Sequence, residues 1–147
     1  MGYALFAQRK LVLDAELNGA QLQQTQRSDE QYALATQKLS LGQQLTSINA
    51  AQAGELADLY GQLADTTEEG SRDSINAQIS QKQQQAQQEV DGINRQIYEV
   101  GVKEESIELE VKRLDTMVTA LQKQLEAVEQ AEGDAIDRAT PNYNGVG

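Results

Sequence analysis

The feature that most constrains this 147-residue sequence is a heptad repeat in its second half. When Val90 is taken as position a, the a and d positions from Val90 to Val128 number twelve, and eleven of them are aliphatic. The exception is Glu104. Six unbroken heptads exceed the three or four that make a coiled-coil prediction credible. The repeat therefore predicts a long helix with one apolar stripe, called the seam below, that faces a partner helix.

The first half of the chain carries a weaker form of the same repeat. One row takes every seventh residue from Phe6 to Ile48, and a second row lies four residues further on. Between Ala20 and Lys38 both rows are mostly polar, so this stretch is either loosely packed or contacted by another chain. After Ile48 an extra four-residue step interrupts the heptads, and such a stutter locally unwinds a supercoil.

The two halves predict an all-α fold, a long antiparallel helical hairpin with a short irregular C-terminal tail. The first proline is Pro141, so nothing interrupts long helices. A polar run around Gly70 predicts the turn, at about residues 65–72, between helices over about 4–64 and about 72–132. Residues 1–132 would form a single helical-hairpin domain, and residues 133–147 the tail. The alternative is one continuous rod kinked at Gly70.

The hairpin also predicts which residues meet. Folding back at Gly70 places Glu104 opposite residues near Lys38, and we expect a buried opposite-charge pair that penalises slipped registers. The alternative is that Glu104 extends to water. The predicted intrachain seam comprises Leu34, Leu41, Leu45, Ile48, Leu59, Leu63, Ile79, Val90, Ile93, Ile97, Val100, Ile107, Val111, Leu114, Val118, Leu121, Leu125 and Val128.

Composition removes most catalytic chemistry. The chain has no His and no Cys, which excludes His/Cys zinc sites, Cys nucleophiles and Ser-His-Asp triads. The carboxylates from Glu104 to Glu110 are interpreted as a solvated face, because ferritin-like sites also need His. We expect no enzyme activity, metal, cofactor or small-molecule substrate. A net charge of −11 with dispersed Lys and Arg argues against nucleic acid, and no run reaches the ~20 apolar residues of a membrane span.

Apolar residues also recur off the seam, on the outer faces of both predicted helices. A two-helix hairpin has no second layer to cover them, which predicts a further contact surface. Glycines within the helices suggest close approach of neighbouring backbones or permitted curvature, and those considered are Gly42, Gly54, Gly61, Gly92 and Gly101. Phe6 either joins this surface or ends the first-helix seam. The predicted assembly interface is Leu5, Phe6, Leu11, Leu22, Tyr32, Leu39, Tyr98, Val102, Leu109 and Met117.

These traits resemble bacterial export-type filament subunits, namely flagellins and the needle and filament proteins of type III secretion. The shared features are a small acidic chain without Cys or Trp and long heptad-bearing terminal helices. In those families the paired helices form the filament core, which is the role implied here for Leu5 to Leu45 and Val100 to Val128. The apolar N-terminal run Tyr3–Phe6 is too short for a secretory signal.

The predicted function is a structural subunit that self-assembles into a helical filament or tube. The expected location is extracellular, reached by signal-peptide-independent export, and the expected partner is a second copy of the chain. If one surface patch contacts a different patch on the next copy, the contact can propagate into a filament. The alternative is an intracellular coiled-coil adaptor or scaffold that binds a partner helix through Leu11, Leu22 and Leu39.

Overall fold

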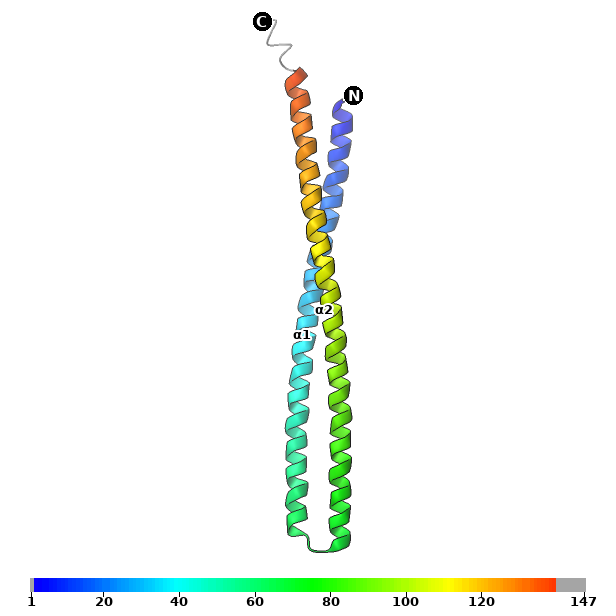
Figure 1. Cartoon of the computed structure of the whole chain (residues 1–147). Helices are drawn as coiled ribbons and strands as arrows, with labels where there is room; N and C mark the ends of the chain where they lie inside the picture. Colours follow the sequence, from blue (N-terminus) through cyan, green and yellow to red (C-terminus); the bar gives the residue numbers. More distant parts are fainter. Residues whose placement is uncertain (1, 140–147) are drawn as a thin grey trace. The chain divides into compact units, whose positions relative to one another are not determined.

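The computed structural model describes residues 2–139, which form two helices. Helix α1 spans Gly2–Asp65 and helix α2 spans Glu69–Ala139, and these residues contain no strand. The helices pack against each other in antiparallel directions across a short turn (Figure 1). This confirms the predicted all-α helical hairpin, and the alternative of a continuous rod is wrong.

The turn is shorter than predicted and does not depend on Gly70. Within residues 2–139 only 66–68 are non-helical, and Gly70 lies in the first turn of α2 without a positive φ angle. The Arg72 guanidinium donates hydrogen bonds to the carbonyl oxygens of Leu63, at 3.2 Å, and Thr66, at 2.9 Å. Carbonyls at a helix C-terminus lack intrahelical partners. Arg72 in α2 therefore supplies hydrogen-bond donors to carbonyl oxygens at the C-terminal end of α1. These bonds allow both helices to extend into the polar run.

Helix α2 also continues past its predicted end near residue 132. Gly133 is helical, so the predicted irregular tail is wrong for residues 133–139, and residues 140–147 lie outside the described part of the chain. A single glycine costs a helix only about 0.8–1 kcal/mol relative to alanine. The alanines at 131, 135 and 139 are the strongest helix formers and favour continuation across it.

The helix contacts form two compact units. Unit 1 combines Met1–Gln31 with Ser106–Gly147, and unit 2 is the continuous segment Tyr32–Glu105. In unit 1 the apolar core consists of seam residues of both helices, and Leu114 has no exposed surface at all. Its buried cluster is Leu13, Ala20, Val118, Leu121 and Val128, with Phe6, Leu17 and Leu125 packed against it.

Unit 2 has its own core and contains the turn. Its buried cluster is Leu41, Ile93 and Val100, with Leu34, Leu45, Ile48 and Ile97 packed against it. Nearer the turn, Leu59 and Ile79 are buried, and the half-buried Leu56 and Leu63 flank Leu59 along α1. The burial pattern of α1 after Ile48 therefore follows the extra four-residue step in the sequence.

Candidate self-association surface

The eighteen predicted seam residues all face the partner helix. Each of them is buried or half-buried, and none is exposed. Each of these positions carries an aliphatic side chain, so burial of one apolar stripe per helix accounts for the packing.

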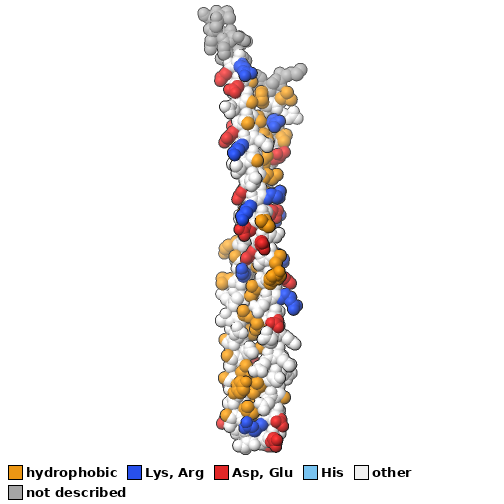
Figure 2. All heavy atoms as spheres, in the orientation of Figure 1, with side chains coloured by type: hydrophobic (Ala, Val, Ile, Leu, Met, Phe, Trp, Pro, Cys, Tyr) orange, Lys and Arg blue, Asp and Glu red, His pale blue; other side chains and the backbone are white. Residues whose placement is uncertain are grey.

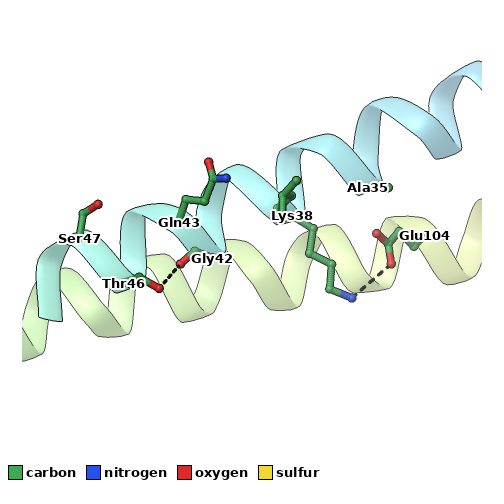
Figure 3. A pocket seen from close by; sticks show the side chains of 8 residues that line it. Ala35, Lys38, Gly42, Gln43, Thr46, Ser47 and Glu104 are labelled. Carbon is green, nitrogen blue, oxygen red and sulfur yellow. Dashed lines mark hydrogen bonds and ion pairs between the residues drawn. The ribbon is translucent and has the colours of Figure 1, made fainter. Parts of the chain in front are cut away.

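The pair predicted to set the register is present in unit 2. Lys38 Nζ lies 3.5 Å from Glu104 Oε2, and Figure 3 shows the two side chains extending toward each other from α1 and α2. The expectation that the pair is buried is wrong. The side chains retain 50% and 31% of their exposed surface, because two helices cannot enclose a long polar side chain at the margin of their seam. Exposed ion pairs contribute only about 0–1 kcal/mol to stability.

The polar stretch of the first-helix seam is contacted by α2 of the same chain, within unit 1. Arg27 occupies a seam position and forms ion pairs with Glu110, at 3.0 Å, and with Glu30 on its own helix. One turn before it, the Gln24 side-chain amide donates a hydrogen bond to Asp115. These contacts come from the same chain, although Arg27 Nε is buried and makes no hydrogen bond. Contact of this stretch by another chain stays a prediction.

The carboxylates around Arg27 also raise the pKa of its guanidinium. The largest cause is the hydrogen bond to Glu30, followed by the contacts with Glu110. A raised pKa means that the stabilisation is present below the ordinary value of arginine and is lost only at pH values above it. Arg27 therefore stays cationic throughout the neutral range.

Nine of the ten residues assigned to the assembly interface are exposed. Tyr32 and Tyr98 retain 77% and 73% of their surface, and Leu39 retains 65%. These three lie in unit 2, together with Val102. The remaining exposed members, all in unit 1, are Leu5, Leu11, Leu22, Leu109 and Met117.

Phe6 does not belong to this surface. It is half-buried and packs against the core of unit 1, so its assignment to the assembly interface is wrong. Its place in the row that also contains Leu13 and Ala20 is the physical reason, since that row faces α2 in unit 1. Phe6 therefore belongs to the first-helix seam.

Three further exposed apolar side chains escaped the sequence analysis: Val12, Tyr60 and Ile136. Val12 directly follows Leu11, which the sequence analysis assigned to the assembly interface. Tyr60 directly follows Leu59, which it assigned to the seam. Ile136 falls in the segment predicted to be an irregular tail. A search for large apolar residues outside both seam rows would have found all three.

The helical glycines leave open space within the chain. A Cβ atom added at Gly42, Gly54, Gly61, Gly92 or Gly101 would meet no heavy atom within 4 Å. Close approach between α1 and α2 is therefore not the reason for these glycines, and close approach of a neighbouring molecule's backbone stays a prediction. The space beside them is available to a neighbouring molecule.

One of these glycines lies in an open groove on unit 2. On α1 the groove is lined by Leu39, Gly42 and Thr46, and the Lys38–Glu104 pair borders it (Figure 3). The hydroxyl of Thr46 donates to the carbonyl oxygen of Gly42 at 3.1 Å, which turns the threonine methyl group outward. The groove is therefore lined mainly by small and uncharged side chains, with Lys38 and Glu104 as its charged residues.

Two other kinds of site do not occur in the described part of the chain. No group of three or more carboxylates within residues 2–139 is arranged to hold a metal ion. Neither α1 nor α2, as described, contains a segment apolar enough to cross a membrane.

Comparison with known proteins gives no assignment. No family model, no curated protein and no solved structure matches this chain.

Proposed function

We propose that this protein is a structural subunit that self-assembles with identical copies into a helical filament or tube. The observation that supports the proposal is a set of large apolar side chains on the outer faces of α1 and α2, of which Tyr32 and Tyr98 are the most exposed. Solitary exposed apolar residues are ordinary, but their recurrence along both helices is typical of a contact surface.

The energetic argument concerns how much apolar surface the hairpin leaves in water. Full burial of one Val, Leu or Tyr-sized side chain is worth about 1.5–3 kcal/mol. Three or four such residues at one contact would offset a substantial part of the 4–15 kcal/mol that association costs. Both partners contribute such residues, so their combined burial can exceed the lower end of that cost and make self-association favourable.

The net charge opposes assembly and makes it adjustable. Copies carrying a charge of −11 repel one another, which keeps unassembled chains soluble. Salt shortens the range of that repulsion to about 10 Å at 0.1 M. Assembly should therefore increase with ionic strength. The role that we propose for the assembled protein is mechanical.

The proposed location is outside the cell, and it follows from the architectural resemblance to exported filament subunits. The other candidate is an intracellular adaptor that binds a partner helix. The same exposed leucines, Leu11, Leu22 and Leu39, would serve that role, so the two functions differ in what covers these residues.

The test is to measure the size of the purified full chain across concentration and salt. Light scattering and negative-stain microscopy should show long fibres that become more abundant as salt increases. The double variant Leu11→Gln/Leu22→Gln should reduce fibre formation while circular dichroism shows unchanged helix content. A matched control, Gln23→Ala, changes an exposed residue of the same helix and should leave assembly intact.

A chain that stays monomeric at millimolar concentration and high salt would contradict the filament proposal. Such a result would favour the adaptor, because the exposed leucines would then need a different protein to cover them.

A further inference from the structure

Asn18 and Gly19 form the one Asn–Gly pair within residues 2–139. The other three asparagines of that range precede alanine or arginine, and they are Asn49, Asn76 and Asn94. All four lie in helices and are exposed. The side-chain amide of asparagine is chemically labile. A following glycine increases that lability, because it has no Cβ atom to obstruct attack by its own backbone nitrogen. Asn18 is therefore the most reactive of the four by sequence.

The reaction of this pair needs only water. The backbone nitrogen of Gly19 attacks the side-chain carbonyl carbon of Asn18, the carbon–nitrogen bond of the side-chain amide breaks, and ammonia leaves with the proton of the Gly19 nitrogen. Water then opens the resulting five-membered succinimide ring at one of its two carbonyl carbons. One opening gives aspartate. The other gives isoaspartate, in which the backbone runs through the former side chain and is longer by a methylene group.

The helix suppresses this reaction while α1 is closed. In a regular helix the N–H of Gly19 donates to the carbonyl oxygen of Ala15, which holds the nitrogen along the helix axis and away from the side chain of Asn18. Attack on the side chain therefore requires local opening of α1. Such openings cost least near chain ends and where few apolar contacts hold a segment.

The part of α1 that contains Asn18 meets both conditions. Helix α1 begins at Gly2, and only four residues of its first twenty belong to the apolar core of unit 1: Phe6, Leu13, Leu17 and Ala20. The next seam positions carry polar side chains, among them Gln24 and Arg27. Polar contacts that remain partly exposed contribute little to stability. The segment from Gly2 to Ala20 is therefore held by a short apolar contact.

We propose that Asn18 is a site of spontaneous deamidation, which proceeds when α1 opens in unit 1, and that the isoaspartate product keeps this part of α1 from closing again. Leu13 and Ala20, on either side of Asn18, are only 5% and 4% exposed and belong to one buried cluster. A methylene group inserted between them changes their separation along α1 and interrupts the hydrogen-bond ladder. Both residues can then no longer keep their places in the cluster.

The product also changes the surface proposed for self-assembly. Leu11, Asn18 and Leu22 follow one another at intervals of seven and four residues, so they share an outer face of α1. Charged side chains are spread along the visible face of unit 1 (Figure 2), and deamidation adds a carboxylate between these two exposed leucines. In a chain of charge −11, an added carboxylate increases the repulsion between copies. This consequence rests on the proposed function, whereas the deamidation does not.

Peptide mapping of the full chain by mass spectrometry tests the site. After several weeks in mildly alkaline buffer, the converted fraction of Asn18 should exceed that of Asn49 at least tenfold. Unfolding in urea should accelerate the conversion of Asn18 a further tenfold or more, because it removes the hydrogen bond to Ala15. A second Asn–Gly pair, Asn144–Gly145, lies outside the described residues and is measured on a separate peptide. Conversion of Asn18 that does not exceed that of Asn49, or that urea does not accelerate, would overturn the inference.

Gly19→Ala is the variant that isolates the chemistry. A Cβ atom added at Gly19 meets no heavy atom within 4 Å, so the fold is kept while the methyl group obstructs attack on Asn18. Conversion of Asn18 should fall at least tenfold, also in urea, where helix stability has no influence. Gly54→Ala changes another open glycine of α1 and should leave the conversion of Asn18 within about twofold. Equal conversion in the two variants in urea would contradict the assignment of the reactive pair.

Hydrogen exchange measures whether the product opens α1. In molecules that contain isoaspartate, the amides of residues 5–17 should exchange at least tenfold faster than in unmodified molecules. Asn18→Asp keeps the ordinary backbone and should exchange like the wild type. Equal exchange in the isoaspartate form would overturn the claim that α1 stays open.

The effect on assembly is measured separately with Asn18→Asp, which should form fibres only at higher salt than the wild type. Fibres at the same salt would overturn the effect on assembly. A wild-type chain that never forms fibres ends the proposed function and leaves the conversion of Asn18 standing. A chain that forms fibres but keeps Asn18 unconverted retains the proposed function and loses this inference.

Discussion

Arg27 Nε lies 3.0 Å from Glu110 Oε1 across the seam of unit 1, at a position where the heptad places an aliphatic side chain. The Arg27 side chain keeps 30% of its exposed surface and the Glu110 side chain keeps 33%. The side chains therefore sit half in water, and the apolar seam is interrupted at this level. The contact aligns α1 and α2 more than it stabilises them, because half-exposed ion pairs contribute little.

Replacing Arg27 with leucine should stabilise the hairpin. Arg27→Leu restores the apolar stripe and buries apolar surface, and the Glu110 carboxylate that it leaves behind keeps contact with water and with Arg113 at 4.0 Å, so the net effect should be neutral or stabilising by about 1 kcal/mol. The expected result is an unchanged or higher midpoint of thermal unfolding by circular dichroism. Glu16→Leu, which changes an exposed residue of α1, is the control for a general effect of added leucine. A clear fall in the midpoint for Arg27→Leu alone would contradict the argument.

Leu114 should be the most sensitive aliphatic position of unit 1, because its side chain has no exposed surface. Leu114→Ala should lower the free energy of unfolding by about 2–5 kcal/mol, through lost burial and a residual cavity. Leu109→Ala removes the same atoms from the outer face of α2, where the side chain is 62% exposed, and should cost about 0.5 kcal/mol or less. Urea denaturation monitored by circular dichroism measures both. Similar losses for the two variants would contradict the assignment of the seam.

The Lys38–Glu104 pair should show a small but measurable coupling. In a double-mutant cycle with Lys38→Ala and Glu104→Ala, the interaction free energy should be about 0.2–1 kcal/mol, because both side chains are partly exposed. The coupling should shrink in 1 M salt, where the screening length falls to about 3 Å. A coupling above 2 kcal/mol that is independent of salt would instead indicate a buried pair.

Gly61 should limit the stability of α1 through backbone entropy. A Cβ there meets nothing within 4 Å, so Gly61→Ala should raise the free energy of unfolding by about 0.8–1 kcal/mol. The measurement is again urea denaturation, and Ala64→Gly, at an exposed position of the same helix, should produce a loss of similar size. No gain from Gly61→Ala would show that the glycine is needed for a conformation other than a regular helix.

The periodic positions were predictable, and so was the contact between Lys38 and Glu104, but the partners of Arg27 were not. Val100, Leu114 and Leu121 recur at heptad spacing, and only a buried stripe satisfies that spacing in a helix of this length. Arg27 occupies a seam row as well, but its partner could not be named, because ion pairs depend on which side chains the opposite helix brings within about 4 Å. Phe6 was ambiguous because the sequence alone did not show whether α2 covers this end of α1.

The turn shows the same limit at the level of local structure. The polar run around Gly70 predicted where the chain reverses. Most of that run is nevertheless helical, because Arg72 donates hydrogen bonds to the carbonyl oxygens of Leu63 and Thr66 at the end of α1. This contact joins residues on opposite sides of the turn and exists only once α1 and α2 are both in place.

The order of residues by itself determined that the chain forms two long helices with one apolar stripe each, because helical periodicity is a local property of the sequence. The tertiary structure decided which residues close the turn, which carboxylates meet Arg27 and that Phe6 is covered while Tyr32 and Leu39 are not. Those outcomes depend on the register between α1 and α2, which is a property of the packed pair and of neither helix alone.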